Sequence, residues 1–316
     1  MAGLREQIRG GILGAVVGDA LGLPHEGETR SRLAEHPVEA MTGGGPHGQP
    51  AGTWSDDSSL LLCLASSLTG GYRPDHVGST FLAWWQEALW TPRGRTVGYG
   101  ATTAAAMYRM AVGVSPLKAG LAGEGANGNG SLMRTLPIAL YFSPKRRPML
   151  DAAHEVSAIT HGHPRAQMCC GIYCLVASYL LEGRQPAEAA RAAMRYARDY
   201  YRDEPWQAER EHLQTVLSLQ IERMDRYQVR SGGYVVETLE AALWSLLRAR
   251  GFRSTLLAAV NLGGDTDTVG CVTGALAGTY YGEEAIPDEW LEPLARRQDV
   301  EDLCDRFAHV VARRRK

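Results

Sequence analysis

The chain has 316 residues, of which 45% are hydrophobic and 22% are charged, and its formal net charge is −2. This composition is ordinary for a globular protein. The net charge lacks the strong basic excess that an electrostatic nucleic-acid binder normally shows. A chain of this length can form one large domain or two small ones. No linker stands out, so we expect a single domain over residues 1–316 with its core at about 8–312.

The N-terminal segment briefly resembles a signal peptide. Arg5 and Arg9 come before the apolar residues 10–17, but Asp19 interrupts that run. No other segment reaches the roughly 18 uncharged apolar residues that a membrane span needs. The six cysteines form no C-x-x-C pair and several lie in apolar runs, which is typical of buried free thiols in a reducing compartment. We therefore expect a cytoplasmic protein without a membrane partner.

Glycines recur at every fourth position near both ends of the chain. They are Gly10, Gly14, Gly18, Gly22, Gly270, Gly274, Gly278 and Gly282. On a helix this spacing places the glycines on one face, where another backbone can approach closely. Each glycine lowers helix propensity by about 1 kcal/mol, so we expect close packing to compensate.

Helical periodicity dominates the rest of the sequence. In residues 238–247 the apolar side chains fall at i, i+3, i+4, i+7 and i+8, which predicts a helix. Further helices are expected at residues 58–68, 101–112, 166–182, 187–199 and 254–260. Three segments resist this assignment: the glycine-rich residues 42–53 and 123–130, and the charged residues 200–212, which we expect to form an exposed connection. Clean alternation is scarce, so the predicted fold class is all-α.

Two expected helix starts are rich in carboxylates and hydroxyls. The first is Ser55-Asp56-Asp57 and the second is Asp265-Thr266-Asp267-Thr268. Serine, threonine and aspartate also cap helices, so capping explains each segment alone equally well. The second segment lies between apolar runs suited to burial, and buried carboxylates need hydrogen bonds, counter-ions or metal. Together the segments predict one site of oxygen ligands, which favours Mg²⁺, Mn²⁺ or Ca²⁺ over zinc or copper.

Three further motifs are ambiguous when each is taken alone. Glu26 follows the N-terminal helix and alone is typical of a surface carboxylate. The segment 128–134 could donate backbone N–H groups to a phosphate at a helix N-terminus. His161 and His163 would point apart on a helix, so we expect a single polar contact from His161 rather than a metal pair.

Six segments resemble, in family order, the motifs of the ADP-ribosylglycohydrolase family, which includes the dinitrogenase reductase-activating glycohydrolases. They are Gly18-Asp19-Ala20-Leu21-Gly22 with Glu26, Trp54-Ser55-Asp56-Asp57, Asn127-Gly128-Asn129-Gly130-Ser131-Leu132-Met133-Arg134, Thr160-His161-Gly162-His163-Pro164, Gly233-Tyr234-Val235-Val236-Glu237-Thr238-Leu239 and Gly263-Gly264-Asp265-Thr266-Asp267-Thr268. They span roughly residues 8–282, and six ordered motifs are far more specific than any one of them.

The resemblance implies a compact orthogonal multi-helix domain with two Mg²⁺ or Mn²⁺ ions at the base of an ADP-ribose cleft. The implied metal ligands are Ser55, Asp56, Asp57, Asp265, Asp267 and Thr268, with Asp267 as the bridge. The family usually has threonine where Ser55 stands, and the hydroxyl is retained. The implied substrate-binding residues are Asn127, Gly128, Asn129, Gly130, Ser131 and His161. Glu124 lies near a position that is acidic in some members.

These residue types suit hydrolysis of a ribosyl bond. Two ions can grip the ribose diol and orient a water, and a carboxylate then accepts the proton of that water. Glu26 or Asp57 is the expected base, and the sequence does not separate them. We therefore expect a metal-dependent hydrolase that releases ADP-ribose from a protein side chain, a nucleic-acid end or a small conjugate.

Two other functions remain open. The chain could be a silent ADP-ribose-binding module, although the retention of all six implied ligands argues against this, or a dinuclear-metal hydrolase of another ribosyl compound. Tyr99 and Trp90 could stack on adenine or a leaving group, although buried packing is the simpler explanation for each alone. The acceptor depends on loops such as 42–52 and 91–100. The oligomeric state is open, with a monomer favoured.

Overall fold

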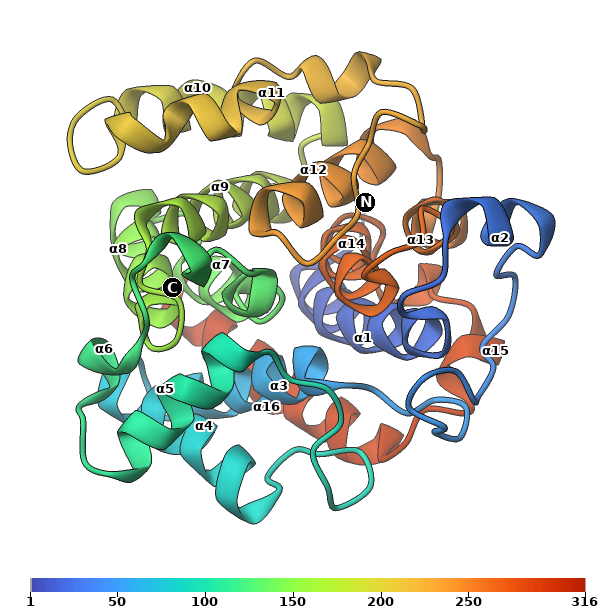
Figure 1. Ribbon diagram of the computed structural model, residues 1–316, viewed down its shortest axis with the longest axis horizontal. Coiled ribbons are helices and arrows are strands. Elements are labelled where there is room, and N and C mark those ends of the chain that lie inside the picture. The colour runs from blue at the N-terminus through green and yellow to red at the C-terminus, as the bar shows by residue number, and fades with distance from the viewer. Residues whose placement is uncertain (1, 316) are drawn as a thin grey trace.

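The computed structural model describes residues 2–315, which fold into helices joined by turns (Figure 1). The α-helices are α1 Leu4–Gly22, α2 Arg30–Glu35, α3 Asp56–Leu68, α4 Pro74–Glu87, α5 Ala101–Ala111, α6 Pro116–Ala119, α7 Leu136–Phe142, α8 Arg146–Ala158, α9 Pro164–Leu181, α10 Pro186–Tyr200, α11 Gln214–Leu217, α12 Val235–Arg248, α13 Phe252–Val260, α14 Thr266–Tyr281, α15 Asp288–Leu291 and α16 Arg297–Arg314. The short 3₁₀ helices are η1 Leu23–His25, η2 Glu124–Ala126, η3 Asn129–Ser131, η4 Gln207–Leu213, η5 Gln220–Arg223 and η6 Glu283–Ala285. Over residues 2–315 the β-pairing is limited to isolated bridges. The predicted all-α fold class is confirmed.

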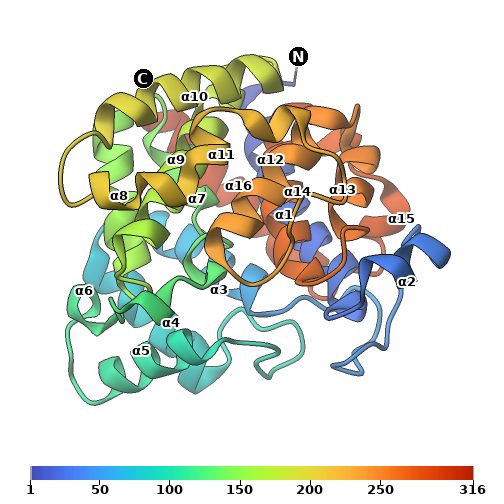
Figure 2. The same ribbon diagram turned by 45° about the horizontal axis from the view of Figure 1, so that its top comes forward.

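Helices α1 and α14 pack backbone to backbone along their glycine faces (Figures 1 and 2). A Cβ atom on Gly14 would lie 2.3 Å from the carbonyl oxygen of Gly274, and one on Gly18 would lie 2.0 Å from that of Gly270. Neither gap has room for a side chain, so the expected close packing is confirmed, and each glycine stripe is the partner of the other. Gly282 departs from the pattern, because it ends α14 with a φ of 84°. This antiparallel contact places the end of α1 beside the start of α14.

The six helices expected from periodicity correspond to α3, α5, α9, α10, α12 and α13. Helix α3 begins two residues earlier than expected because Ser55 caps it. Helices α4, α9 and α10 each begin with a proline, whose missing N–H has no intrahelical partner at that position. Cap chemistry therefore explains where these helices begin better than apolar periodicity does.

The charged segment 200–212 requires a correction. We expected an exposed connection, but Tyr201 is fully buried and η4 begins at Gln207. Trp206 packs against His154 on α8 with ring centroids 4.5 Å apart, so aromatic anchors hold the charged segment on the helices beneath it. The glycine-rich segment 123–130 also differs from a simple loop, because it contains η2 and begins η3. Residues 42–53 contain no helix, as expected.

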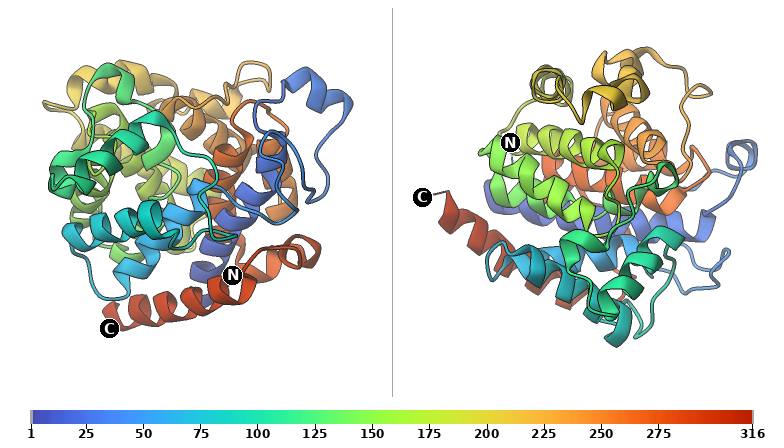
Figure 3. Two further views of the ribbon diagram at one scale, coloured as in Figure 1. Left: turned by 60° about the horizontal axis from the view of Figure 1, so that its bottom comes forward. Right: turned by 60° about the vertical axis from the view of Figure 1, so that its left-hand side comes forward.

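Helix α16 runs along the outside of the molecule (Figure 3, left) and packs against α1 and α3. The two ends of the chain thus share one layer of helices, and buried apolar side chains extend from Ile8 to Val311. The single domain over residues 1–316 stays a prediction. Within residues 2–315, each helix is too short or too polar to cross a membrane.

Candidate active site

A cavity of about 390 Å³ lies where the end of α1 and the starts of α3 and α14 come together with the glycine-rich segment before α7. Its lining consists of Glu26, His47, Asp56, Asp57, Gly98, Tyr99, Gly100, Thr102, Thr103, Gly128, Asn129, Gly130, Met133, His161, Gly233, Asp265, Asp267 and Thr268. The structure therefore brings eleven of the fourteen predicted site residues to one cavity. The other three, Ser55, Asn127 and Ser131, lie behind its wall.

The start of α3 is held by hydrogen bonds on two sides. Ser55 caps the helix, since its Oγ accepts from the N–H of Asp57 at 3.1 Å and donates to Oδ2 of Asp57 at 2.6 Å. Asp19 on α1 accepts from the N–H of Ser55 at 2.9 Å and from the N–H and hydroxyl of Ser58 at 2.9 and 2.6 Å. The capping interpretation therefore holds for Ser55, and Asp19 fixes the same turn from outside.

Sequence reasoning missed the role of Asp19. Its signal was present, because this carboxylate interrupts an otherwise apolar helix, where an unpaired charge is unfavourable. Its two partners are 36 and 39 residues further along the chain, beyond any local pattern.

Asp57 and Asp267 have carboxylate oxygens that suit a cation. One oxygen each from Asp19, Asp57 and Asp267 lie within 4.8 Å of one another, and all three residues are buried. The Oδ1 atoms of Asp57 and Asp267 are buried without a hydrogen-bond partner. Buried carboxylate oxygens need a donor or a cation, and hard divalent ions prefer oxygen ligands. The residues present thus fit a divalent metal ion.

Burial also shifts the protonation of these carboxyls. Burial, supplemented by the charge of Asp19, raises the pKa of Asp56 to about 8. Burial raises the pKa of Asp19 to about 6, opposed by its hydrogen bonds from Ser58 and Ser55. For Asp57 and Asp267, burial and neighbouring carboxylates raise the pKa well above its usual value. Placing these charges together is therefore unfavourable unless protons or cations are bound.

The start of α14 is arranged differently from the start of α3. Asp265 occupies the cap position, but its side chain makes no capping hydrogen bond. Instead its Oδ2 accepts from the side-chain amide of Asn129 at 2.7 Å. Thr268 is buried and lines the cavity beside Asp267. Capping is thus not the function of the Asp265 side chain, which faces the cavity and the glycine-rich segment.

Asn129 ties the glycine-rich segment to two other elements. Its side-chain amide donates to Asp265 and also to Oγ1 of Thr238 on α12 at 2.9 Å. Its backbone N–H donates to the carbonyl of Gly233 at 3.0 Å. Thr238 belongs to one of the six family motifs, but the sequence does not predict its contact with Asn129, which lies 109 residues away in the chain.

His161 faces the cavity against the same segment. A Cβ atom on Gly130 would lie 2.9 Å from Cε1 of His161, so only glycine allows this approach. Thr160 Oγ1 accepts from the guanidinium of Arg134 at 2.8 Å and lies 2.7 Å from Nδ1 of His161. If the hydroxyl of Thr160 donates to Nδ1, Nε2–H is the donor that faces the cavity. Burial and Arg134 lower the pKa of His161 to about 3, so its ring is neutral.

Arg134 is a fully buried cation that supports this wall. It donates to the carbonyl oxygens of Gly130 and Val156 and stacks over Phe81 at 4.7 Å. Ser131 lies in the same interior, where its Oγ contacts Ser157 at 2.9 Å rather than the cavity. The predicted role of Ser131 in substrate binding would therefore fall to its backbone.

Comparison with known proteins agrees with this geometry. The sequence model of the ADP-ribosylglycohydrolase family matches residues 1–316. The chain belongs to the ADP-ribosylglycohydrolase family. As a member it is a hydrolase of ribosyl bonds, and the resemblance drawn from the ordered motifs is confirmed.

Two curated relatives of this ADP-ribosylglycohydrolase span most of its length. ADP-ribosylarginine hydrolase Tri1 of Pseudomonas putida (strain GB-1) is 31% identical over 310 residues, covering 95% of this chain and 77% of the relative. ADP-ribosyl-[dinitrogen reductase] glycohydrolase of Rhodospirillum rubrum is 29% identical and covers 94% of this chain and 93% of the relative. A solved ADP-ribosylglycohydrolase-related protein complex superposes with a TM-score of 0.81 at 34% identity, covering 98% of this chain and 99% of that one.

Of the two aromatic residues considered for stacking in this ADP-ribosylglycohydrolase, Tyr99 lines the cavity and Trp90 does not. Tyr99 lines the cavity with 49% of its surface exposed and packs edge-to-face on Trp85 at 4.9 Å. Trp90 is buried, beneath the guanidinium of Arg296 at 5.2 Å. The structure therefore keeps Tyr99 as a candidate for stacking and assigns Trp90 to packing.

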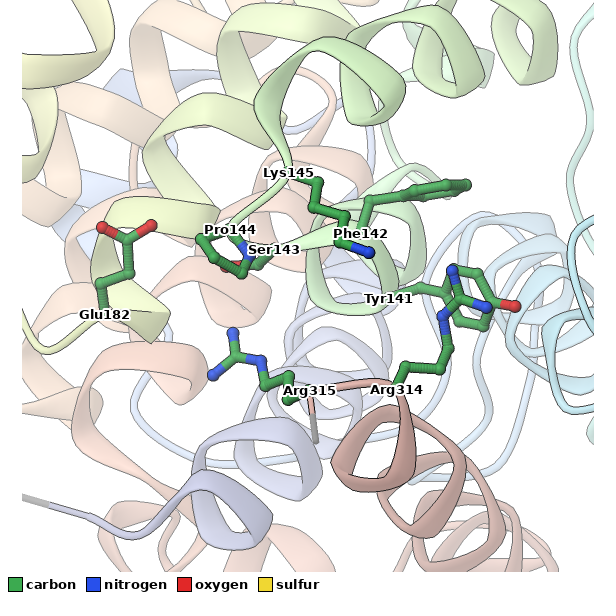
Figure 4. A pocket seen from close by; sticks show the side chains of 8 residues that line it. All are labelled: Tyr141, Phe142, Ser143, Pro144, Lys145, Glu182, Arg314 and Arg315. Atoms are coloured by element: carbon green, nitrogen blue, oxygen red, sulfur yellow. The ribbon is translucent and has the colours of Figure 1, made fainter.

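A second cavity, of about 440 Å³, lies between the end of α7 and the end of α16 (Figure 4). Lys145, Arg314 and Arg315 line it, and its carboxylate, Glu182, is paired with Arg146 at 2.6 Å. Although larger, this cavity offers cations where a metal needs oxygen ligands. The smaller acidic cavity is therefore the candidate active site of the enzyme.

Proposed function

We propose that this enzyme hydrolyses the bond between ADP-ribose and its acceptor, using two divalent ions, Mg²⁺ or Mn²⁺, held in the acidic cavity. The observation that supports the proposal most is the pair of buried oxygens without partners, Oδ1 of Asp57 and Oδ1 of Asp267, facing a cavity walled by glycines and His161. A neutral binding pocket has no need for such carboxylates, because burying them is unfavourable without a cation.

The proposed ligands are those implied by the family motifs. They are Ser55, Asp56, Asp57, Asp265, Asp267 and Thr268, and these would hold the ions. Asp19 would act mainly by orienting them, because both of its oxygens already accept hydrogen bonds. When bound, the ions would offset the carboxylate charge and polarise the ribose hydroxyls and a water molecule.

Glu26 is the better candidate for the general base. Asp57 is buried, its Oδ2 accepts from Ser55, and its remaining oxygen suits a metal. Glu26 lines the same cavity with 40% of its side chain exposed, so it can meet a water and pass the proton on to solvent. We therefore assign proton transfer to Glu26 and metal binding to Asp57.

The other wall of the cavity suits a ribose diphosphate. Gly128 and Gly130 expose backbone there, and the neutral ring of His161 would donate from Nε2 when Thr160 donates to its Nδ1. Tyr99 at the mouth could stack on the adenine or on the leaving group. These groups would hold ADP-ribose so that its anomeric carbon lies above the carboxylates.

Arginine-linked ADP-ribose is the acceptor linkage to test first, because a relative with 31% identity is named an ADP-ribosylarginine hydrolase. Purified protein would be incubated with Mn²⁺ or Mg²⁺ and a panel of arginine-, serine- and thymidine-linked ADP-ribose together with O-acetyl-ADP-ribose. Release of ADP-ribose from one member supports the proposal. Tight ADP-ribose binding without release would identify a silent binding module instead. If the protein neither releases nor binds ADP-ribose, hydrolysis of another ribosyl compound is favoured.

A cytoplasmic location is also part of the proposal. All six cysteines are buried and free, which suits a reducing compartment. Measuring the location of a tagged chain by cell fractionation would test it.

A further inference from the structure

We propose that His47 is a positioning residue that orients the carboxylate of Glu26 for proton transfer. The inference rests on the proposed function, in which Glu26 is the base. His47 Nε2 lies 2.5 Å from Oε2 of Glu26, and both side chains line the acidic cavity. Within residues 2–315, His47 is the one residue that hydrogen-bonds the Glu26 carboxylate.

The backbone beside Glu26 is fixed, so its side chain is what remains to be oriented. The N–H of Gly27 donates to the carbonyl of Gly264 at 2.8 Å, and the N–H of Gly264 donates to the carbonyl of Glu28 at 2.9 Å. This reciprocal pair clamps the segment to the start of α14, one residue before Asp265. A glutamate side chain on a fixed backbone still has three rotatable bonds, and a partner is needed to favour one rotamer.

The loop that carries His47 is built to hold it in place. The N–H of Gly44 donates to the carbonyl of Gln49 at 2.7 Å, and the N–H of Gly48 donates to that of Gly45 at 3.1 Å. Gly44, Gly45 and Gly48 have φ values of 95°, 66° and 58°, which residues other than glycine rarely adopt. The side chain of Gln49 also donates to the carbonyl of His47 at 2.7 Å.

The same loop rests directly on the segment that leads to Glu26. A Cβ atom on Gly45 would lie 2.1 Å from the carbonyl oxygen of Pro24, two residues before Glu26. The loop and the segment that leads to Glu26 are therefore packed backbone against backbone. The length and glycine content of the loop are explained by the need to bring an imidazole to this carboxylate.

The direction of the hydrogen bond leaves one carboxylate oxygen for chemistry. An ionised carboxylate only accepts, so Nε2 of His47 carries the hydrogen and donates it to Oε2. Oε1 of Glu26 then remains for the attacking water. His47 thus holds the outer side of the Glu26 carboxylate and opposes its rotation into solvent.

Loss of the bond should lower turnover more than substrate affinity. Partners that orient a functional group typically change activity by roughly 10- to 100-fold when removed, and we expect kcat of His47→Ala to fall within that range. KM should change by less than about 3-fold, because His47 acts through Glu26 rather than on ADP-ribose. His47→Gln retains a donor at similar reach and should recover most of the loss.

The experiment is a double-mutant cycle with the metal-loaded full chain. Turnover is measured for wild type, His47→Ala, His47→Gln, Glu26→Gln and the double variant His47→Ala/Glu26→Gln, with the exposed His36→Ala as a matched control. If His47 works through Glu26, the double variant should be no slower than Glu26→Gln alone. A full second loss of activity in the double variant would overturn the proposal, as would a His47→Ala variant with wild-type kcat.

A second measurement separates this proposal from the proposed function. Histidine ¹⁵N spectra of the metal-free chain identify the His47 ring by its absence in His47→Gln. Glu26→Gln should shift that ring's Nε2 resonance and leave His36 unchanged. If the wild type releases no ADP-ribose from any conjugate, the proposed function fails, yet the spectrum still reports on the pair. An unchanged His47 resonance would show that the pair does not form and would overturn the positioning role.

Discussion

The starts of α3 and α14 contain the same residue types but are held in opposite ways. At α3, Ser55 caps the helix and Asp19 accepts from the backbone of the same turn, so these N–H groups are paired, although Oδ1 of Asp57 has no partner. At α14, Asp265 makes no capping hydrogen bond and Asp267 keeps an oxygen without a partner. Carboxylates at a helix start are ordinarily explained by capping, and here that explanation holds for one start only.

The difference indicates that the start of α3 is mainly structural, while the start of α14 is mainly available for a ligand. The backbone of the start of α3 is held before any ligand arrives, because Ser55 and Asp19 accept from its N–H groups. The start of α14 lacks a capping hydrogen bond: Asn129 donates to Asp265 instead, and Oδ1 of Asp267 would gain its missing partner from a cation. The backbone contact between the glycine faces of α1 and α14 keeps the two starts in register, since Asp19 follows Gly18 and Asp267 precedes Gly270 by three residues.

The largest expected effect comes from removing the incomplete side. Asp267→Ala should abolish both metal binding and hydrolysis while leaving helical content largely intact, because its Oδ1 has no structural partner. Calorimetric titration with Mn²⁺, an ADP-ribose release assay and far-ultraviolet circular dichroism would measure the three properties. Wild-type turnover in this variant would rule out the site as described.

Removing the acceptor at the start of α3, Asp19, should mainly lower the stability of the fold. Asp19→Ala leaves the N–H groups of Ser55 and Ser58 buried without acceptors, and each such group costs about 1–3 kcal/mol. We expect the free energy of unfolding in urea to fall by roughly 2–5 kcal/mol. Asp267→Ala should instead leave the free energy of unfolding unchanged or raised, because it removes a buried carboxyl whose Oδ1 has no hydrogen-bond partner. Equal destabilisation by both variants would contradict the division between the two helix starts.

The pH dependence of stability probes the carboxylates of both starts together. Burial raises the pKa of Asp19 to about 6 and of Asp56 to about 8, above the roughly 3.9 of an unfolded aspartate. A raised folded-state pKa stabilises fully below the unfolded pKa, and this contribution is lost as pH rises through the folded pKa. The metal-free protein should therefore be less stable at pH 8 than at pH 5, by on the order of 5 kcal/mol.

Saturating Mn²⁺ should remove that loss, because the ion binds the ionised carboxylates of the folded chain. Thermal melting between pH 5 and pH 8, with a chelator or with Mn²⁺, measures both trends. The variant Asp56→Asn serves as the matched control and should flatten the metal-free profile between about pH 6 and 8. A metal-free protein that gains stability over this window would show that the carboxylates are already compensated.

Sequence patterns identified the fold and the contents of the site better than its internal connections. The four-residue glycine spacing predicted a close helix contact, and ordered motifs predicted carboxylates that the structure places in one cavity. Both signals are local or repeat along the chain. The contacts of Asp19 with Ser58, His47 with Glu26 and Asn129 with Thr238 join segments distant in sequence, and their partners depend on how helices pack.

The charged segment 200–212 also shows that local sequence does not reveal tertiary contacts. Its composition predicted exposure, yet Tyr201 and Trp206 anchor it against His154. Two aromatic side chains outweigh many charges because each buries a large apolar area, while the charged groups remain at the surface. Local composition therefore predicts where charges lie more reliably than whether a segment is attached to the core.

The smallest expected effect tests whether the start of α14 depends on α12. Thr238→Val keeps the shape of the side chain but removes one of the two acceptors of the Asn129 amide, leaving Asp265 as the other. A neutral hydrogen bond contributes about 0.5–1.5 kcal/mol, so we expect KM for the ADP-ribosyl substrate to rise by roughly 3- to 10-fold with little change in kcat. Thr238→Ser retains the acceptor and should behave as wild type. If Thr238→Val lowers kcat instead, Asn129 would be orienting Asp265 for the chemical step rather than shaping the substrate wall, and the start of α14 would be less independent of its surroundings than its missing cap suggests.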